Sequence, residues 1–420
     1  MRIFFMSNSI GRGYGYSRAY GKLAHELAKK GYDVIYFGMQ DNCPPWRDEN
    51  GILRLGVRYA PYGGDILGYY LRSYKPDVFI SGVDLWMDDI EYIPQIVHKR
   101  RIPWIAGVTV NSEPLSHMLF RTIRHATVLV SPSRFGVEVM AREGLNSLHI
   151  PHGLDLDVFK PKHEPVFDLF KLAKPKHVAL SVQRNKGFQK GIPILFDAWQ
   201  KLVMEHTEYA SDAVLLMLTD PQEPEGFETL LELRKRLGLE DQIQFLWARP
   251  DENGELIPTF EGDARGMPHN ANIGFSEEVM SCLYNIAGVH VLSSMCESFN
   301  LPTAEALACG TPCIAPNHSA LPELITGGEP TPRGLLVDIA AKFILPTISE
   351  LNMASTEHMA ESIHTMFSDK RLHKRCSKRG VGFTKRFGWN KIVPQWEKLI
   401  NDVYEGFYFN SNYNEGILGV

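Results

Sequence analysis

Short apolar segments alternate with amphipathic helical patterns along most of this chain, and that alternation restricts the fold more than any other feature. Residues 2–6 are mostly apolar and are typical of a buried strand. A glycine-containing loop follows, and residues 17–30 carry leucines and alanines at helical spacing. Gly31 ends this predicted helix before the next strand at 32–37. Strands that alternate with helices in this way predict a doubly wound α/β fold with parallel sheets.

The alternation runs in two successive series, separated by a segment rich in lysine and proline at 161–175 that is typical of a linker. In the first series, further strands are predicted at residues 77–81, 104–110, 127–131 and 148–151, with a helix over about 134–143. In the second series, strands are predicted at residues 177–182, 213–218, 243–246, 289–293 and 312–315, and a final helix at about 389–408. We therefore predict two doubly wound Rossmann-like domains that face each other across a cleft, which 420 residues are enough to form.

One long polar stretch, residues 249–274, interrupts the second series. We expect an inserted loop there. No internal repeat or low-complexity tract is present, so the two series account for most of the chain.

Composition and charge exclude several classes of protein. Apolar residues make up 44% and charged residues 22% of the chain, which excludes disordered, coiled-coil and collagen-like chains. The net charge of −5 argues against a general nucleic-acid binder, so we expect no nucleic-acid partner. Residues 1–160 hold 19 Lys and Arg against 16 Asp and Glu, whereas residues 161–420 hold 25 against 33. The two parts are therefore expected to meet different partners.

The lack of a recognisable targeting signal and the cysteine usage both predict a cytoplasmic protein. No stretch of about 18 apolar residues occurs, and the first apolar segment is too short for a signal peptide. The six cysteines are scattered without metal-ligand spacing, which is typical of reduced and mostly buried thiols.

The most informative segment for chemistry spans residues 294–312. It follows a predicted strand and opens a helix, with Glu297 in the connecting loop and Glu305 about one turn into the helix. Both carboxylates can face the crevice at the carboxyl end of the strand, where open α/β sheets bind ligands. The free N–H groups at the helix N-terminus favour a phosphate. The alternative is that both glutamates are solvated residues at the helix edge.

A basic loop follows the first strand of the second series. It contains Arg184, Lys186 and Lys190, ahead of a predicted helix at 192–205. Fixed cations in such a loop can stabilise negative charge on a phosphate without a metal ion. The alternative is a solvated basic loop.

Segment 294–312 resembles the Glu-x7-Glu motif of retaining glycosyltransferases of family 4, which have the GT-B fold. The similarity extends through Glu-Ala-Leu-Ala-Cys-Gly-Thr-Pro at its end. By this resemblance, Glu297 would contact hydroxyls of the donor sugar and Glu305 would hydrogen-bond the ribose of the nucleotide. Arg184 and Lys190 best match the family's phosphate-binding pair, with Lys186 as a competing candidate.

The resemblance also implies a donor-binding backbone at the start of the helix. The candidates there are Ser298, Phe299, Asn300 and Leu301. Ser298 and Asn300 stand where the family often has glycines, a departure that bears on the preferred sugar. Residues 272–276 lie where the family's base-binding loop would be.

Two further segments resemble the regions that join the domains in this family. Residues 150–161 resemble the connector, with His152 in place of the usual Asn, and residues 387–390 resemble the start of a helix that crosses back onto the first domain. His152 is interpreted either as a hinge residue satisfied by the backbone or as a catalytic residue. The expected domains are an N-terminal acceptor-side domain at 1–155, completed by the helix at 389–420, and a C-terminal donor-binding domain at 156–388.

The first domain matches the family only in pattern. Gly13 and Gly15, in its first loop, are expected to let the donor or acceptor approach the backbone closely. Many family members place a His near the donor sugar after the fourth strand. Asn111 and Glu113 occupy that region here, with His117 as a third acceptor-side candidate.

Residues 115–126 combine apolar positions at helical spacing with arginines. This pattern predicts either a basic amphipathic helix in peripheral contact with anionic lipid, or an ordinary packed helix with a solvated face.

The resemblance implies a metal-independent retaining glycosyltransferase with a UDP- or GDP-linked sugar as donor and no cofactor besides it. The acceptor would be a hydroxyl of a carbohydrate, a lipid or another molecule. One alternative is a non-catalytic nucleotide-sugar binding protein. Another is a GT-B isomerase or phosphorylase, the latter holding a phosphorylated cofactor through a lysine Schiff base. A dinucleotide dehydrogenase is disfavoured, because no acidic ribose partner follows a proper glycine fingerprint.

Overall fold

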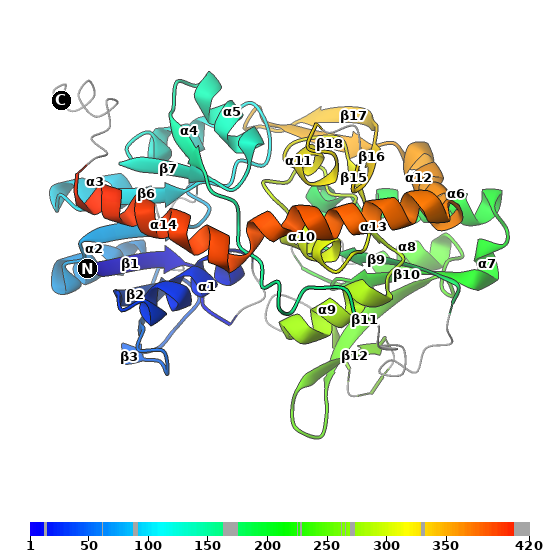
Figure 1. Ribbon diagram of the computed structural model, residues 1–420, viewed down its shortest axis with the longest axis horizontal. Helices are drawn as coiled ribbons and strands as arrows, with labels where there is room; N and C mark the ends of the chain where they lie inside the picture. The colour runs from blue at the N-terminus through cyan, green and yellow to red at the C-terminus, as the bar shows by residue number, and fades with distance from the viewer. Residues whose placement is uncertain are drawn as a thin grey trace. The chain divides into compact units, whose positions relative to one another are not determined.

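The chain forms two compact units, each with its own largely parallel sheet (Figure 1). Unit 1 comprises Met1–Gly153, Pro346–Ser349 and Trp389–Val420, and unit 2 comprises Leu154–Leu345 and Glu350–Gly388. The structure is a computed structural model. It describes residues 1–11, 15–60, 62–86, 91–162, 175–224, 226, 229–261, 263–264, 266–268, 274–328 and 332–406.

The sheet of unit 1 has the strand order β3-β4-β2-β1-β5-β6-β7-β8, in which β3 is antiparallel to β4 and the other pairs are parallel. Its strands are β1 (Arg2–Ser7), β2 (Asp33–Gly38), β3 (Trp46–Arg47), β4 (Leu53–Gly56), β5 (Val78–Gly82), β6 (Trp104–Gly107), β7 (Val128–Ser131) and β8 (Ser147–His149). Its helices are α1 (Gly15–Lys29), α2 (Gly64–Tyr74), α3 (Ile93–Lys99), α4 (His117–Ile123), α5 (Arg134–Arg142) and α14 (Trp389–Tyr404).

Alternate residues of the central strand β1 point to opposite faces of this sheet, as strand geometry requires. Phe4 and Met6 join the core beneath α2, α3, α4 and α5. Ile3 and Phe5 join the core formed with α1 and α14. Helix α14 buries Ile392, Val393, Trp396, Leu399, Ile400 and Val403. Helices α1 and α14, which lie far apart in the sequence, therefore cover the same face of the sheet of unit 1.

The sheet of unit 2 has the order β12-β11-β10-β9-β14-β15-β16, with β13 also paired to β11. Strands β12 and β13 are antiparallel to β11, and the other pairs are parallel. Its strands are β9 (His177–Val182), β10 (Ala213–Leu218), β11 (Ile243–Pro250), β12 (Leu256–Phe260), β13 (Met267–Pro268), β14 (Val289–Val291), β15 (Cys313–Pro316) and β16 (Gly334–Val337), with a separate pair, β17 (Ile339–Ile344) and β18 (Glu350–Ala354). Its helices are α6 (Ile192–Glu205), α7 (Tyr209–Asp212), α8 (Leu230–Arg236), α9 (Glu277–Ile286), α10 (Leu301–Ala308), α11 (Leu321–Ile325), α12 (Thr356–Ser368) and α13 (Lys370–Thr384), with 3-10 turns η3 (Gly187–Lys190) and η4 (Lys385–Phe387).

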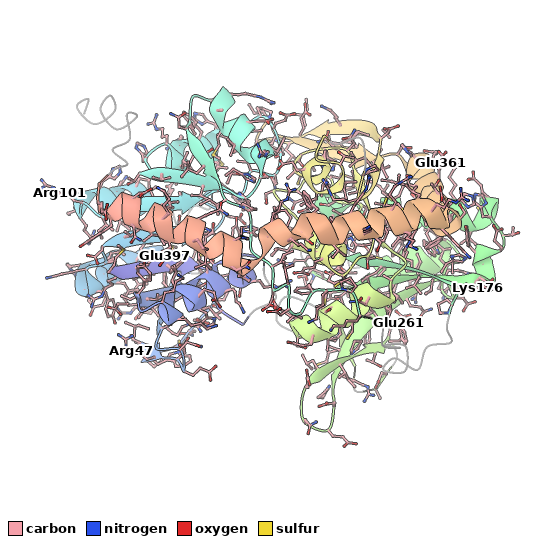
Figure 2. All side chains as sticks on the ribbon, viewed as in Figure 1. Arg47, Arg101, Lys176, Glu261, Glu361 and Glu397 are labelled. Carbon is pink, nitrogen blue, oxygen red and sulfur yellow. The ribbon has the colours of Figure 1, made fainter. Side chains whose placement is uncertain are left out.

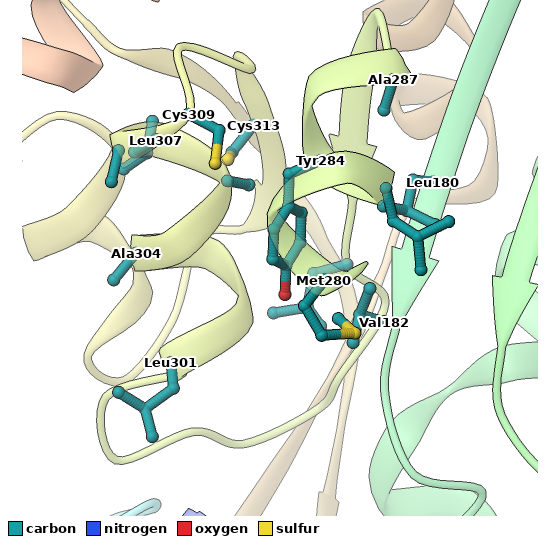
Figure 3. Close-up of a cluster of buried hydrophobic side chains, with 14 of the residues drawn as sticks. Leu180, Val182, Met280, Tyr284, Ala287, Leu301, Ala304, Leu307, Cys309 and Cys313 are labelled. Carbon is teal, nitrogen blue, oxygen red and sulfur yellow. The ribbon is translucent and has the colours of Figure 1, made fainter. Parts of the chain in front are cut away.

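Both faces of the second sheet are covered by helices, which is why its central strands are apolar without alternation. Helices α9, α10 and α11 cover one face, and α6, α8 and α12 cover the other. In the first of these cores, Tyr284 and Met280 of α9 lie near Val182 of β9, and Ala304 and Leu307 project from α10 (Figure 3). This packing fixes α10, the helix that carries Glu305.

Charged side chains surround the cores of both units (Figure 2). Glu397 of α14 pairs with Lys30 at the end of α1, with Nζ and Oε2 2.9 Å apart. In unit 2, Glu261 pairs with the buried Arg234 of α8. Each of these ion pairs joins two elements of one unit.

Two sequence-based expectations about elements prove wrong. The strand predicted at 104–110 ends at Gly107. The polar stretch 249–274 is not simply a loop, because β11 continues to Pro250 and turns back as β12. Gly254 has a φ of 82°, which a tight turn at Asn253–Gly254 requires. Most of the predicted linker 161–175 lies outside the described residues.

Neither membrane-spanning helices nor disulfides occur in the described residues. No helix there is long and apolar enough to cross a bilayer. All six cysteines are free thiols, and four of them are buried, as predicted: Cys296, Cys309, Cys313 and Cys376.

His290 of β14 creates an acid sensitivity in unit 2. It is fully buried, neither ring nitrogen has a hydrogen-bond partner among the described residues, and burial lowers its pKa to about 3. The folded form therefore stays neutral while the unfolded form binds a proton below its pKa of about 6.5. Stability is complete above that pH and falls as the pH drops toward 3.

The free energy of unfolding is expected to fall less between pH 7 and pH 5 when His290 is replaced with leucine, by about 2 kcal/mol. The reason is that pH 5 lies 1.5 pH units below the pKa of the unfolded form, and each unit costs about 1.4 kcal/mol. Urea unfolding at both pH values measures the effect. An unchanged pH dependence in the variant would contradict this origin of the acid sensitivity.

Candidate functional site

The loop between β14 and α10 lies at the carboxyl edge of the second sheet, where open α/β sheets bind ligands. Asn300 ends this loop with a φ of 74°, and its side-chain oxygen accepts a hydrogen bond from the N–H of Thr303 at 2.9 Å. Glycine and asparagine tolerate this left-handed conformation best, which explains how Asn300 replaces a glycine of the resembled motif. The N–H of Ala304 donates to the carbonyl of Asn300 at 3.3 Å and Pro302 has no N–H, so the first turn leaves only the N–H of Leu301 among its first four residues.

Lys190 and Glu297 form a close pair at this edge. The ammonium of Lys190, at the end of η3, lies 2.5 Å from Oε1 of Glu297 and donates a longer bond of 3.4 Å to Oγ of Ser294. Burial alone would lower the pKa of Lys190, but the attraction and hydrogen bond of Glu297 outweigh it, so the pKa lies above its ordinary value. The ammonium of Lys190 is therefore charged at neutral pH.

The interpretation of both glutamates as solvated residues at a helix edge is wrong, because both are buried. Glu297 is 9% exposed and Glu305 is fully buried. Glu305 accepts a hydrogen bond from the hydroxyl of Tyr284 on α9 at 2.9 Å. The helix contact that Figure 3 shows thus positions the second carboxylate as well.

A chain of hydrogen bonds fixes the backbone of Glu297. Its N–H donates to Oγ of Ser319 at 3.1 Å, and Ser319 lies 2.8 Å from Nδ1 of His318. Nε2 of His318 lies 2.8 Å from the carbonyl oxygen of Ser294, which only accepts, so Nε2 carries the proton and the Ser319 hydroxyl donates to Nδ1. Burial lowers the pKa of His318 to about 4, which keeps this arrangement neutral at pH 7.

His318 and Ser319 are residues that the sequence analysis missed. They follow β15 and reach the site only because β14 and β15 are neighbours in the sheet. A left-handed φ of 48° at Ser319 aims its side chain at the loop. The signal that could have found them is their place directly after a predicted strand adjacent to the site.

The basic loop after β9 does not bring all its cations to Glu297. The guanidinium of Arg184 lies 3.3 Å from Glu223, and Lys186 is exposed. The backbone of η3 is tied to the β14–α10 loop, since the N–H of Met295 donates to the carbonyl of Gln189 at 2.8 Å. Lys190, and not Arg184, is therefore the cation that contacts Glu297.

The candidates of unit 1 each have different surroundings. Gly13 lies outside the described residues, and Gly15 is the exposed first residue of α1. Asn111 accepts a hydrogen bond from Ser112. Glu113 forms an ion pair with Arg142, and His117 is the exposed first residue of α4.

Unit 1 has a polar cluster of its own that the sequence did not reveal. The hydroxyl of Tyr16 on α1 donates to Asp84 at 2.8 Å and contacts the hydroxyl of Thr109. Burial and the nearby Asp84 raise the pKa of Tyr16. His152 packs edge-on against Tyr20 at 6.3 Å between ring centres, and burial lowers its pKa to about 4.

No group of three or more His, Cys, Asp or Glu in the described ranges is arranged to hold an ion.

Both the β14–α10 segment and the fold are similar to those of known proteins. Residues 266–344, which include Glu297 and Glu305, match the family model described as "Glycosyl transferases group 1". The structure is similar to sucrose-phosphate synthase from Thermosynechococcus elongatus, with a TM-score of 0.74 at 18% identity over 96% of this chain and 99% of that one. It is similar to Anabaena HepE in complex with UDP, with a TM-score of 0.67 at 16% identity over 96% and 100% of the two chains. The chain has the GT-B fold, and the predicted pair of Rossmann-like domains is confirmed.

The chain is also similar in sequence to three further proteins. N-acetyl-alpha-D-glucosaminyl L-malate synthase from Bacillus anthracis is 27% identical over 215 residues, 51% of this chain and 42% of that protein. D-inositol 3-phosphate glycosyltransferase from Corynebacterium glutamicum is 25% identical over 255 residues, 60% of this chain and 50% of that protein. The chain thus matches half or less of the length of these two relatives. An uncharacterized glycosyltransferase from Haemophilus influenzae is 20% identical over 413 residues, 94% of this chain and 99% of that protein.

Proposed function

We propose that the protein is a retaining, metal-independent glycosyltransferase of family 4 that moves a sugar from a UDP- or GDP-linked donor to an acceptor hydroxyl. The observation that carries the proposal is the partly buried pair of Lys190 and Glu297 beside the start of α10. Removing two charges from water is costly, so an ion pair that is largely withdrawn from water beside the carboxyl end of a strand points to a functional site. Glu297 also lies in the segment that matches glycosyl transferases group 1.

The proposed reaction places negative charge where unit 2 has cations. The bond between the sugar C1 and the diphosphate oxygen breaks, the acceptor oxygen bonds to C1 on the same face, and its proton leaves with the diphosphate. Lys190 and Arg184 would stabilise the diphosphate as it departs. The N–H of Leu301 at the start of α10 would add to this stabilisation.

The two glutamates take different parts in the proposal. Glu297, held by Ser319 through its backbone, would orient the hydroxyls of the donor sugar. Glu305 would hold the ribose, far from the breaking bond. The choice of UDP or GDP rests on HepE, which was solved with UDP, and on a Mycobacterium tuberculosis relative whose name describes it as GDP-mannose-dependent.

Incubation with labelled UDP- and GDP-sugars tests the proposal, with transfer to an acceptor or hydrolysis expected. Glu297→Ala and Arg184→Ala are each expected to lower turnover about 100-fold, the size of effect seen when a stabilising group is removed from a transition state. The exposed residues Glu357 and Arg236 provide matched controls, since E357A and R236A should keep full turnover.

Two outcomes would overturn parts of the proposal. Unchanged turnover in Glu297→Ala and Arg184→Ala would show that the site is assigned wrongly. Tight UDP or GDP binding in calorimetry, without turnover on a broad acceptor panel, would show a nucleotide-sugar binding protein instead of an enzyme.

Ser319→Ala is expected to lower kcat about fivefold with little change in the donor KM, because losing one hydrogen bond costs about 1 kcal/mol and loosens Glu297. Ser319→Gly should show the same loss, although glycine relieves the left-handed φ at this position. Steady-state kinetics of both variants separate the hydroxyl from the backbone. Full activity in Ser319→Gly would show that the hydroxyl does not position Glu297.

A further inference from the structure

A strongly basic hollow lies over helix α13 in unit 2. Its volume is about 780 Å³, and no residue of the β14–α10 loop lines it. The lining contains seven cationic side chains: Arg333, Arg371, Lys374, Arg375, Lys378, Arg379 and Arg386. Gly382 and Phe383 complete it.

The cations of α13 lie on one face of the helix because their spacing is helical. Arg371, Arg375 and Arg379 follow at intervals of four residues, and Lys374 and Lys378 run beside them. Residues 370–387 hold eight Lys and Arg and no Asp or Glu, within a part of the chain that is acidic overall. Like charges four residues apart destabilise a helix, so this face is unfavourable unless something compensates the charge.

The described residues do not compensate it. Among the described residues, no carboxylate forms a salt bridge with any of the six hollow-lining cations of α13 and η4, whereas Lys398 on α14 pairs with Asp402. Nη1 of Arg379 is buried and has no hydrogen-bond partner among the described residues. The site therefore contains a buried donor that the described chain leaves unsatisfied.

Two arginines are held in place at one end of the hollow. The guanidinium of Arg333 lies 3.7 Å from the ring centre of Phe383, and that of Arg386 lies 4.3 Å from it. Arg333 also donates to the backbone carbonyls of Leu324 and Glu323 at 2.7 and 2.9 Å. Ordered guanidinium groups lose less freedom when they bind an anion.

Gly382 keeps the hollow open. A Cβ added there would meet nothing within 4 Å, whereas one at Gly380 would lie 2.9 Å from the carbonyl oxygen of Leu307. Packing against α10 thus explains the glycine at 380, but no neighbour explains the one at 382. A glycine inside a helix is unfavourable, and close approach of a ligand is one reason for it.

We propose that this hollow binds clustered phosphate groups, two or more together, at a site separate from the donor site. Arginine forks recognise phosphate by paired hydrogen bonds. The face from Arg371 to Arg379 is about 12 Å long, at 1.5 Å per residue, which gives room for more than one phosphate. The groups are carried either by one small molecule or side by side on an anionic lipid surface.

Calorimetry with inorganic tripolyphosphate on the full chain tests the site at fixed ionic strength. Arg371→Gln with Arg375→Gln is expected to weaken binding at least tenfold. The exposed pair Lys235 and Arg236 on α8 gives the control, since K235Q/R236Q removes the same charge and should bind as the unmodified protein does. Arg184→Ala should also retain this binding, which separates the hollow from the donor site.

A second variant blocks the hollow without changing its charge. Gly382→Leu is expected to weaken binding at least tenfold, and Gly382→Ala much less, with melting curves confirming that both fold. Sedimentation with vesicles of phosphatidylglycerol and phosphatidylcholine, against phosphatidylcholine alone, tests the lipid source. Binding to either probe that is lost in R371Q/R375Q supports the proposal. The proposal is overturned if neither probe binds, or if R371Q/R375Q and K235Q/R236Q bind equally well.

Discussion

Replacing Lys190 with methionine is expected to lower kcat for sugar transfer by about 10²–10³-fold, the range for removal of one group that stabilises transition-state charge. Methionine keeps much of the apolar length of lysine and removes the ammonium that lies 2.5 Å from Glu297. The substitution also leaves a buried carboxylate without its partner, which is expected to cost about 3–5 kcal/mol of stability. Steady-state kinetics and urea unfolding measure the two effects.

A double variant separates stability from catalysis. Adding Glu297→Gln to Lys190→Met removes the unpaired charge, so stability should recover while kcat stays low. The neighbouring exposed residue Lys186 provides the matched control. If Lys190 is the cation that stabilises the departing diphosphate, Lys186→Met should keep kcat within about twofold. Low kcat in Lys186→Met together with normal kcat in Lys190→Met would reverse the assignment of these two residues.

Glu305→Gln is expected to raise the donor KM by about 10–100-fold and to change kcat much less. A hydrogen bond to a charged group contributes about 1.5–3 kcal/mol, and each 1.4 kcal/mol is a factor of ten. The ribose lies away from the bond that breaks, so losing its hydrogen bond to Glu305 weakens donor binding equally in the ground state and the transition state. The amide can still accept from the hydroxyl of Tyr284, which preserves the contact between α9 and α10.

Tyr284→Phe is the control for this variant. It removes the phenol hydroxyl but leaves the carboxylate of Glu305 for the nucleotide, so its effect on KM should be several-fold smaller. Donor titrations of the two variants make the comparison. A donor KM in Glu305→Gln within twofold of the unmodified value would rule out Glu305 as the ribose ligand.

The fold was predictable from the sequence where strands are buried on both faces. The apolar runs at 2–6, 177–182 and 213–218 correspond to β1, β9 and β10. Such runs carry a strong signal because both faces of a parallel strand meet helices. The β11–β12 hairpin was missed because β12 is only half buried and contains Pro258, so its apolar pattern is weak. Its Asn253–Gly254 turn was the usable signal.

The candidate site was predictable only where chemistry and sequence proximity coincide. Glu297 and Glu305 share one short segment, and Lys190 follows a strand in the same way. His318 reaches Ser294 through the pairing of β14 with β15, a contact that spacing along the chain does not express. Burial of Glu305 depends on α9, which carries Tyr284, and no local pattern specifies how two helices pack.

The return of α14 to unit 1 affects the order in which the two units can fold during synthesis. During synthesis, residues 1–153 emerge first, yet six apolar residues that cover their sheet belong to a helix that starts at Trp389. Unit 2 is complete at Gly388, so its sheet and helices are available to fold before that cover exists. Although N-terminal domains generally fold first on the ribosome, the first unit here is completed only after the helix that begins at Trp389 has been made. A nascent chain that stalls near residue 388 would expose an apolar face that chaperones and proteases recognise.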